Sequence, residues 1–250
     1  MKRMMSVSLV CGLLMSSVSA EEKPSEVLDA AIKAAGGAEA LGKVKAMKRE
    51  YSGKIAVMGA DVEFTATAID AFPGKSRATI DLSVGGTAIK VLQVLNGDKV
   101  KMSVSVGGTD MSPPIDDNTK EELRQSTLLE EIFLLVSLRD AKRFEVQVID
   151  GVKVDGKETV GLLIAPKSAK GVKVYFDKKS MLMVRMERRG LSSESKQIDQ
   201  VYTMSNYKKF DGIERPTRLK VTHDGKDYLD ATVKSYEHLE KVDEKFSTDD

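Results

Sequence analysis

The stretch from Asp61 to Ala68 reads DVEFTATA, and its periodicity decides the fold. Apolar residues occupy every second position from Val62 onward, with Asp, Glu and Thr between them. Successive side chains of a β-strand point to opposite faces, so this alternation predicts a strand with one buried face. The same pattern recurs in residues 78–84 and 100–106, and Pro-Gly, Gly-Gly and Asn-Gly pairs punctuate the runs. Such pairs join neighbouring antiparallel strands, so residues from about 47 to 109 are predicted to form a β-meander.

The second half of the chain carries the same signals. Asp-Gly pairs at Asp150, Asp155, Asp211 and Asp224 mark turns between short runs with β-forming residues. The expected strands cover residues 144–149, 158–164, 172–176, 181–187, 197–207, 215–222 and 228–236.

Helical periodicity interrupts the strands in two places. Ser25 is the expected cap of a helix that runs to Ala35, and residues 38–44 add a further turn. Thr119 with Glu122 forms an expected capping box for a helix that runs to about Leu138. Residues 132–136 of that helix are apolar around the whole circumference, so this end is expected to be buried on more than one side.

These elements predict a mainly β protein with a helical lid, of the α+β class. We expect a single curved antiparallel sheet, or an unclosed β-barrel, of about a dozen strands covered by two or three helices. Since no linker rich in Gly, Ser or Pro divides the sequence, residues 21–250 are predicted to form a single half-barrel domain.

The first 20 residues have the features of a signal peptide. Lys2 and Arg3 precede an apolar stretch, and Val18-Ser19-Ala20 offers small residues for cleavage after Ala20. Residues 1–20 are therefore predicted to direct export, which makes the mature protein periplasmic or secreted. The only cysteine, Cys11, lies in this segment, so the mature chain has no thiol for disulfides, catalysis or metal binding.

Charge and hydropathy exclude two broad classes of protein. The chain has 39 basic and 38 acidic residues, a net charge of +1, which does not favour binding to nucleic acid. Outside the leader, no apolar run approaches the roughly 20 residues that span a bilayer, so no transmembrane span is expected.

The sequence gives little indication of a catalytic site. His223 and His238 stand at opposite ends of the last predicted hairpin and are expected to be surface imidazoles. The acidic pairs at 116–117 and 130–131 are expected to be helix caps and solvated charge. No motif for a nucleophilic serine, a zinc site or a phosphate-binding loop is present. We therefore predict that the protein is not an enzyme and binds no metal or cofactor. A secreted hydrolase is a further alternative, but the sequence has no recognisable nucleophile for it.

Three stretches carry a resemblance to a known family. They are GGAEAL at residues 36–41, VKVYFDKKSML at residues 172–182, and NYKKFDGIERPT at residues 206–217. Together with the long meander, they resemble the LolA/LolB-like superfamily of bacterial envelope proteins, and its outer-membrane lipoprotein-sorting-like members in particular. The resemblance covers nearly the whole mature chain.

This resemblance implies an unclosed antiparallel barrel with a helical lid over an apolar cavity that accommodates acyl chains. In the lipoprotein carrier of the superfamily, an arginine locks the lid. No single arginine of this sequence aligns with it, and Arg77, Arg185 and Arg215 are alternatives on predicted strands.

A second apolar signal lies in residues 181–186. Met181 and Met183 are expected to share one face, with Leu182, Val184 and Met186 on the other, as in a strand covered on both sides. Methionine suits a pocket for ligands of irregular shape, although an ordinary core is the alternative.

The function predicted from these observations is binding of an acyl chain, lipid or lipoprotein in an apolar half-barrel cavity, as a carrier or sensor in the cell envelope. The candidate cavity and lid residues are Leu28, Ile32, Phe64, Met102, Val104, Leu128, Ile132, Phe133, Leu135, Met181 and Met183. The alternative is a non-catalytic interaction or scaffold module with the same fold and no ligand, which would dock an envelope protein through a sheet edge or the basic residues of 167–189.

Overall fold

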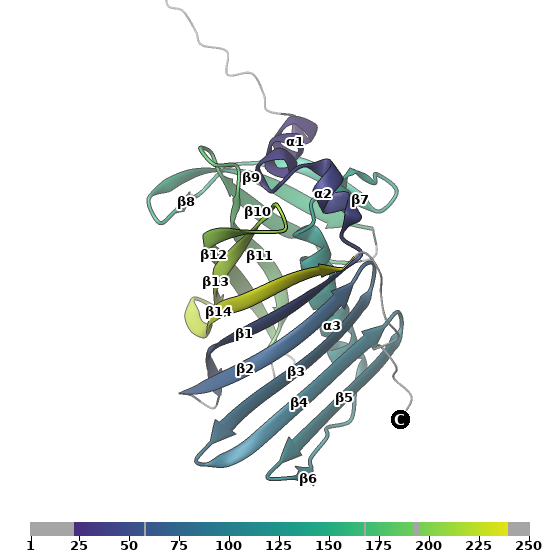
Figure 1. Ribbon diagram of the computed structural model, residues 1–250, viewed down its shortest axis with the longest axis vertical. Coiled ribbons are helices and arrows are strands. Elements are labelled where there is room, and N and C mark those ends of the chain that lie inside the picture. Colours follow the sequence, from purple (N-terminus) through teal and green to yellow (C-terminus); the bar gives the residue numbers. More distant parts are fainter. Residues whose placement is uncertain (1–22, 58, 168, 193–195, 240–250) are drawn as a thin grey trace, which may run out of the picture.

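The structure is a computed structural model that describes residues 23–57, 59–167, 169–192 and 196–239 (Figure 1). The predicted signal peptide, its cleavage site after Ala20 and Cys11 lie outside these residues.

The described residues form one 14-stranded sheet in which every pairing between neighbours is antiparallel. Its strands are β1 (Ala46–Val57), β2 (Ala60–Ala71), β3 (Lys75–Val84), β4 (Thr87–Asn96), β5 (Lys99–Val106), β6 (Thr109–Asp110), β7 (Phe144–Ile149), β8 (Lys153–Val154), β9 (Lys157–Pro166), β10 (Val172–Asp177), β11 (Met183–Leu191), β12 (Gln197–Phe210), β13 (Ile213–His223) and β14 (Lys226–Leu239).

The strand order explains why the sheet stays open. It runs β6-β5-β4-β3-β2-β1-β14-β13-β12-β11-β10-β9-β7, with β8 paired to β9 off this path. The first strand, β1, pairs with the last, β14, and so joins the predicted meander to the second half of the chain. The two ends of the path, β6 and β7, do not meet, and the predicted unclosed antiparallel sheet is confirmed.

The helices gather on this sheet, with α1 and α2 at the end formed by β7, β9 and β10 (Figure 1). They are α1 (Pro24–Ala34), α2 (Ala38–Lys43), α3 (Asp117–Ile132) and the 3₁₀ helix η1 (Val136–Arg139). The two short N-terminal helices agree with the sequence. The predicted Ser25 cap is wrong, because Lys23 is the N-cap and Pro24, whose ring fixes a helical φ, starts α1.

The predicted central helix differs from the structure at both ends. Asp116 caps α3 by accepting a hydrogen bond from the Thr119 backbone N–H at 2.7 Å, so the proposed Thr119 capping box is wrong. The helix stops at Ile132 and not near Leu138, because Leu135 adopts a φ of 58° and the chain turns before η1. The all-round apolar stretch is therefore a buried turn.

The methionine-rich strand begins later than predicted and runs further along the chain, from Met183 to Leu191. Met181 has a φ of 55° and lies in the turn before β11. A bulge opposite Tyr175 and Phe176 interrupts strict alternation. As a result Met183 and Met186 both enter the core, and their predicted placement on opposite faces is wrong.

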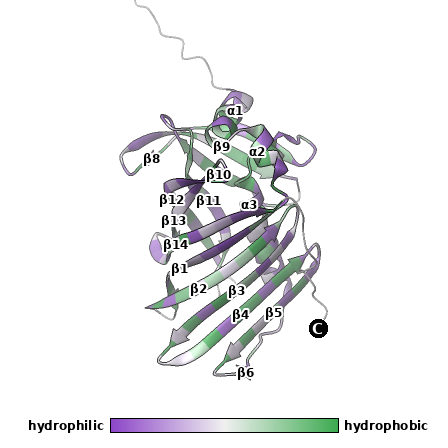
Figure 2. Cartoon of the chain, in the orientation of Figure 1, coloured by the Kyte–Doolittle hydropathy of each residue, from purple (hydrophilic) through white to green (hydrophobic). Residues whose placement is uncertain are grey.

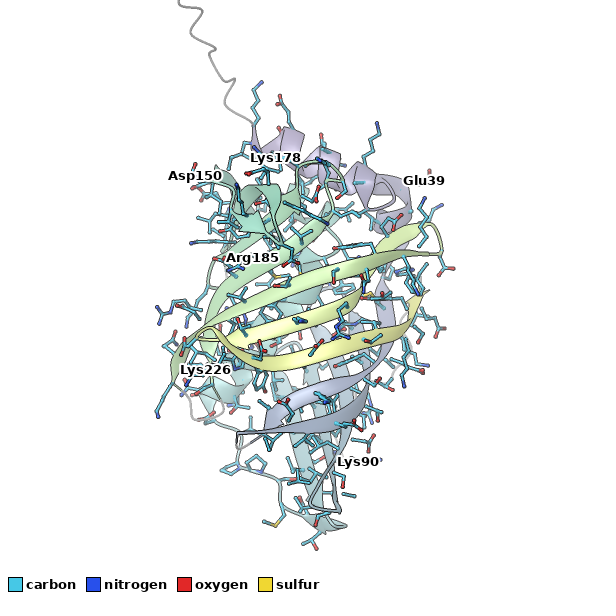
Figure 3. All side chains as sticks on the ribbon, turned by 90° about the vertical axis from the view of Figure 1, so that its left-hand side faces the viewer. Glu39, Lys90, Asp150, Lys178, Arg185 and Lys226 are labelled. Atoms are coloured by element: carbon cyan, nitrogen blue, oxygen red, sulfur yellow. The ribbon has the colours of Figure 1, made fainter. Side chains whose placement is uncertain are left out.

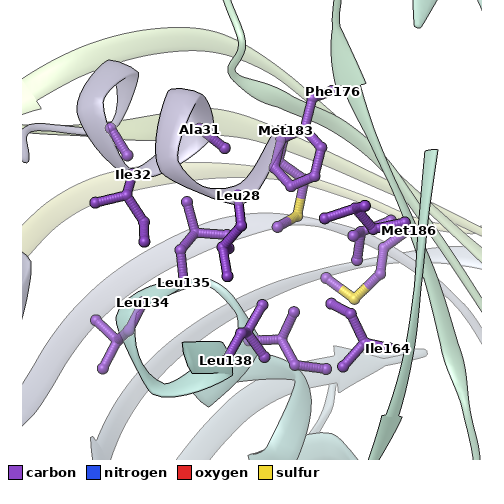
Figure 4. Packing of buried hydrophobic residues seen from close by; sticks show 14 of the residues in the cluster. Leu28, Ala31, Ile32, Leu134, Leu135, Leu138, Ile164, Phe176, Met183 and Met186 are labelled. Carbon is purple, nitrogen blue, oxygen red and sulfur yellow. The ribbon is translucent and has the colours of Figure 1, made fainter. Parts of the chain in front are cut away.

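The main core fills the space between the helices and the second half of the sheet. Figure 4 shows Leu28 and Ile32 of α1 facing Leu135, with Met183 and Met186 of β11 beside them. Figure 2 shows the green, hydrophobic residues of β9 and β10 close to α1 and α2. Leu162, Ile164 and Val174 on these strands are completely buried. This half of the molecule therefore has two packed layers.

The extension formed by β2–β5 is packed differently. It has a small buried cluster of Phe64, Ala66 and Ala231, against which Tyr51 and Ile80 pack. Most apolar side chains of β3–β5 are only half-buried.

Two of the three stretches that carry the family resemblance meet in space. Gly36, at φ 129°, lies against Gly212 and Ile213, and a Cβ at Gly36 would stand 2.8 Å from the Gly212 carbonyl oxygen. The backbone N–H of Glu214 donates to the Ala35 carbonyl oxygen at 2.9 Å. The turn between α1 and α2 is thus joined to the turn between β12 and β13.

The edge of the sheet at β5 is occupied by the residues that follow it. After the two-residue strand β6, the Met111 N–H donates to the Val104 carbonyl oxygen at 2.7 Å. The Val104 N–H donates to the Ser112 hydroxyl at 3.0 Å.

Candidate functional site

The inner face of the sheet, which faces α3, is ordered into cross-strand rows. The pairing of β1 through β5 places inner-face residues directly opposite one another. The two rows nearer α3, called the covered rows, are Met47–Asp70–Ser76–Leu95–Val100 and Arg49–Ala68–Ala78–Gln93–Met102. The next two, called the apolar rows, are Tyr51–Ala66–Ile80–Val91–Val104 and Gly53–Phe64–Leu82–Ile89–Val106.

Helix α3 lies over the covered rows. Its residues Leu123, Ser126, Thr127 and Glu130 line a cavity of about 150 Å³ together with members of both covered rows on β1–β4. The walls of this cavity are mixed, since Asp70, Ser76 and Gln93 stand among alanine and leucine side chains.

The apolar rows offer a different surface. Phe64 is buried and meets the Tyr51 ring edge-on, with 5.9 Å between ring centroids. The side chains farther along the rows are half-buried, namely those of Ile80, Leu82, Ile89, Val91, Val104 and Val106. A half-exposed face of mainly aliphatic and aromatic side chains is the kind of surface that binds an apolar ligand.

A second, smaller cavity lies deeper beneath α3. It has a volume of about 60 Å³ and is lined by Met47, Arg49, Leu129, Glu130, Phe133, Met186, Tyr202, Met204, Arg215, Pro216, Leu219, Val233 and Tyr236. Most of these side chains are apolar, but two arginines and a glutamate are among them. Its volume suits a few water-sized groups and not a whole acyl chain.

The first polar tether of α3 holds its N-terminal half to β11. Arg188 donates hydrogen bonds to both carboxylate oxygens of Glu122, one of them at 3.3 Å. The Leu191 N–H also donates to Glu122, at 3.1 Å. The Arg188 side chain is only 2% exposed, so the pair is largely shielded from water.

The second tether joins the C-terminal half of α3 to β1. Arg49 lies 2.8 Å from Glu130 and 2.6 Å from Asp70, and Asp70 accepts a further hydrogen bond from Ser76. The two carboxylates outweigh the effect of burial and raise the pKa of Arg49. Burial raises the pKa of Glu130, although Arg49 opposes this. Next to it, Glu131 is buried and paired with Arg143 at 2.8 Å, so the predicted solvated charge at 130–131 is wrong.

The third tether engages the carboxyl end of α3. Arg215 of β13 donates to the Phe133 carbonyl oxygen at 3.1 Å, where a cation is favoured by the helix dipole. Its Nε donates to Nε2 of His238 at 3.3 Å. Burial lowers the pKa of Arg215, which is 2% exposed. Of the three alternative arginines, Arg215 is the one that contacts α3: Arg185 pairs with Glu187 on its own strand, and Arg77 lies opposite Ile69 and Val94 on the outer face.

His238 corrects a second expectation from the sequence. Its side chain is 6% exposed, so the predicted surface imidazole is wrong at this position. Burial lowers the pKa of His238, and Arg215 lowers it further. A neutral imidazole keeps the lone pair that accepts the Arg215 hydrogen bond.

The outer face of the sheet has a large open groove of about 810 Å³. Charges of both signs line it, with Lys54, Arg218 and Lys234 against Glu63, Asp81 and Asp230. Figure 3 shows charged side chains such as Lys90 and Lys226 distributed around the molecule. This groove therefore has no charge of one sign to select a charged ligand.

The structure distributes the predicted site residues over three places. Five lie in the filled core: Ile132, together with Leu28, Ile32, Leu135 and Met183, of which the last four are labelled in Figure 4. Leu128, Phe133 and Met181 are partly buried against that core, and Phe133 also lines the 60 Å³ cavity. Phe64 and Val104 belong to the apolar rows, and Met102 to a covered row.

Sequence reasoning missed two of the arginines that hold α3, Arg49 and Arg188, and left Arg215 as one of three alternatives. Arg49, Arg188 and Arg215 stand at inward positions of strands, where a charged residue is unusual. The basic segment 167–189 suggests a surface position for Arg188, but Arg188 follows Met186 by two residues and shares its inward face. Inward arginines on strands with apolar neighbours are the signal that could have located the site.

The sequence matches no protein-family profile and no curated protein. Among solved structures, a LolA superfamily protein from Nitrosomonas europaea superposes with a TM-score of 0.52 and 10% identity, over 91% of this chain and 99% of that one. A DUF1329 family protein from Desulfovibrio piger superposes with a TM-score of 0.50 and 15% identity, over 86% of this chain and 92% of that one. This chain has a LolA-like fold. At these identities the comparison identifies the LolA-like architecture and not the ligand.

Two further properties concern the described residues alone. In residues 23–57, 59–167, 169–192 and 196–239, none of the helices has both the length and the apolar character that a bilayer crossing requires. The same residues of this LolA-like chain bring together no group of three or more His, Asp or Glu side chains suited to a metal ion.

Proposed function

We propose that the protein is exported, through cleavage after Ala20, and binds the acyl chain of a lipid or lipoprotein in the cell envelope. The observation that carries the proposal is the pair of apolar rows, a continuous and half-exposed hydrophobic face next to a helix held by polar tethers. The acyl chain lies along the apolar rows of β1–β5, and α3 acts as the lid. Phe64 and Val104 contact the chain, while Leu128 and Phe133 belong to the lid.

The free energy of ligand burial opposes the cost of releasing α3, which is held by polar tethers and by the burial of Leu129 and Ile132. Each buried CH₂ group of a ligand contributes about 0.8 kcal/mol, before the cost of ordering the chain. The three tethers of α3 are charge-assisted hydrogen bonds, which water or a ligand can replace group by group. The function is binding and release, and it needs no catalytic residue or cofactor.

The first test is native mass spectrometry, with lipid extraction, of the mature protein purified from its own cell envelope without detergent. The expected result is a stoichiometric acyl-containing ligand. A mass without ligand, together with no binding of added lipids, would contradict the proposal and favour the interaction module.

A matched pair of variants locates the binding face. Val104→Asp places a charge in an apolar row and is expected to reduce acyl-chain binding at least about tenfold. Ser103→Asp places the same charge on the outer face of the same strand and is expected to leave binding unchanged. Circular dichroism and thermal unfolding check that both variants fold; equal binding by the two would show that the ligand does not use this face.

A further inference from the structure

Each of the three arginines beneath α3 depends on an acceptor that α3 supplies. Arg188 of β11 donates hydrogen bonds to Glu122, and Arg49 of β1 forms an ion pair with Glu130. Arg215 of β13 donates a hydrogen bond to the Phe133 carbonyl oxygen. Among these three arginines, only Arg49 is also paired with a carboxylate from a strand, that of Asp70.

All three guanidinium groups also keep a buried N–H without a hydrogen-bond partner among the described residues. These atoms are Nε of Arg49, Nε of Arg188 and Nη2 of Arg215. A buried donor without an acceptor costs free energy, and the cost is greater for a charged group. Arg49 and Arg215 line the same 60 Å³ cavity, and Tyr202, 3.5 Å from Arg188, lines it as well. Each of the three arginines can therefore donate one further hydrogen bond to an acceptor on a ligand.

The charge of the inner face depends on where α3 lies. With α3 in place, Glu122 and Glu130 of the helix and Asp70 of β2 balance Arg49, Arg188 and Arg215. When α3 moves away, both helix carboxylates leave with it, and three guanidinium groups face one carboxylate. An opened site is therefore cationic beside an apolar surface.

We propose that the ligand is an anionic amphiphile, whose head group replaces the acceptors of α3 on these arginines while its chain lies on the apolar rows. This inference rests on the proposed function and adds the chemical class of the ligand. The head group is a carboxylate or a phosphate, since both accept paired hydrogen bonds from guanidinium. A neutral head group would leave the arginines without counter-charge, and a cationic one would be repelled.

Four ligands with the same chain test the head group: laurate, dodecyl phosphate, dodecanol and dodecyltrimethylammonium. Their affinities for the mature protein are measured by titration calorimetry below the concentrations at which they form micelles. Laurate or dodecyl phosphate is expected to bind roughly tenfold or more tightly than dodecanol. The anion that binds more tightly shows whether the head group of the ligand is a carboxylate or a phosphate.

Other outcomes separate the two proposals. If dodecanol binds as tightly as both anions, the acyl-chain function stands and the anionic class is overturned. If none of the four binds, the proposed function fails as well. If inorganic phosphate alone binds as tightly as dodecyl phosphate, the site recognises an anion and the amphiphile is overturned.

A variant on the lid tests the competition directly and avoids removing a buried arginine. Glu130→Gln removes the carboxylate that occupies Arg49, so the ratio of laurate to dodecanol affinity is expected to rise about threefold or more. The control Glu121→Gln removes a charge from the same helix at a residue that contacts Gln125, and its ratio is expected to stay unchanged. An equal gain for laurate and dodecanol in Glu130→Gln would indicate only a looser lid and would overturn the proposal.

Discussion

At the scale of single residues, burial changed the chemistry of groups that the sequence places at the surface. Glu130, Glu131 and His238 stand beside charged or polar neighbours in the sequence, which favours a solvated position. Their actual partners, Arg49, Arg143 and Arg215, lie 12 or more residues away along the chain and become neighbours only in the folded protein. Residue types and spacing predict such pairs poorly, because the pairing depends on how helix α3 and the strands pack in the folded protein.

His238 gives the protein a predicted pH dependence of stability. Its pKa is lowered in the folded state, first by burial and then by Arg215, whereas the unfolded chain has the usual value of about 6.5. The unfolded state therefore binds the proton more readily, and the free energy of unfolding is expected to fall as pH drops below about 6.5. Urea denaturation between pH 7.5 and pH 5 measures the loss.

The variant His238→Gln separates this contribution from that of other groups. Its side-chain carbonyl keeps an acceptor for Arg215 but does not titrate, so the loss of stability on acidification is expected to be smaller. His223, whose pKa burial also lowers, provides the comparison through His223→Gln. An unchanged pH profile in His238→Gln would contradict the assignment.

At the scale of elements, local signals located most strands and helices but not their ends. Strand β7 has the predicted bounds 144–149, because alternation and a following Asp-Gly turn agree there. Helix α3 and strand β11 departed from prediction at Leu135 and Met181, where non-glycine residues adopt positive φ. Tertiary packing imposes such conformations, and residue propensity does not indicate them.

The joint between the α1–α2 turn and the β12–β13 turn leads to a prediction about Gly36. Gly36→Ala would combine a positive φ with a Cβ 2.8 Å from the Gly212 carbonyl oxygen. It is expected to lower the free energy of unfolding by about 2 to 4 kcal/mol. The control Gly42→Ala, in α2 with no atom within 4 Å of its Cβ, is expected to raise it by up to about 1 kcal/mol. Urea denaturation of both variants measures the difference, and equal stabilities would contradict the close packing.

At the scale of the whole molecule, the fold class followed from the sequence, whereas the candidate site residues are spread over the core and the apolar and covered rows. Alternation, turn pairs and the family resemblance predicted the open sheet with helices. The candidate residues were chosen for apolar character, so five of the eleven lie in the filled core. Apolar side chains look alike in the sequence whether they fill a core or line a surface for a ligand, and the difference arises from which of them α1, η1 and α3 cover.

The two halves of the sheet are expected to differ in local stability. Strands β9 and β10 lie in the main core, whereas β4 and β5 have half-buried side chains and few covering atoms. Amide hydrogen exchange measured by mass spectrometry is expected to be at least about tenfold faster in peptides from β4 and β5. Added laurate is expected to slow exchange there and to leave β9 and β10 unchanged. Uniform exchange rates across the sheet would contradict this division.

The hydrogen bonds that Met111 and Ser112 make with Val104 also bear on self-association. An exposed edge strand with free N–H and C=O groups is a template for strands of other molecules, and β5 stands at an edge with apolar neighbours. By occupying both backbone groups of Val104, the segment after β6 removes one docking position at the point where the apolar row reaches the edge. The same short segment that ends the meander is therefore expected to hinder edge-to-edge pairing of the apolar rows with another molecule.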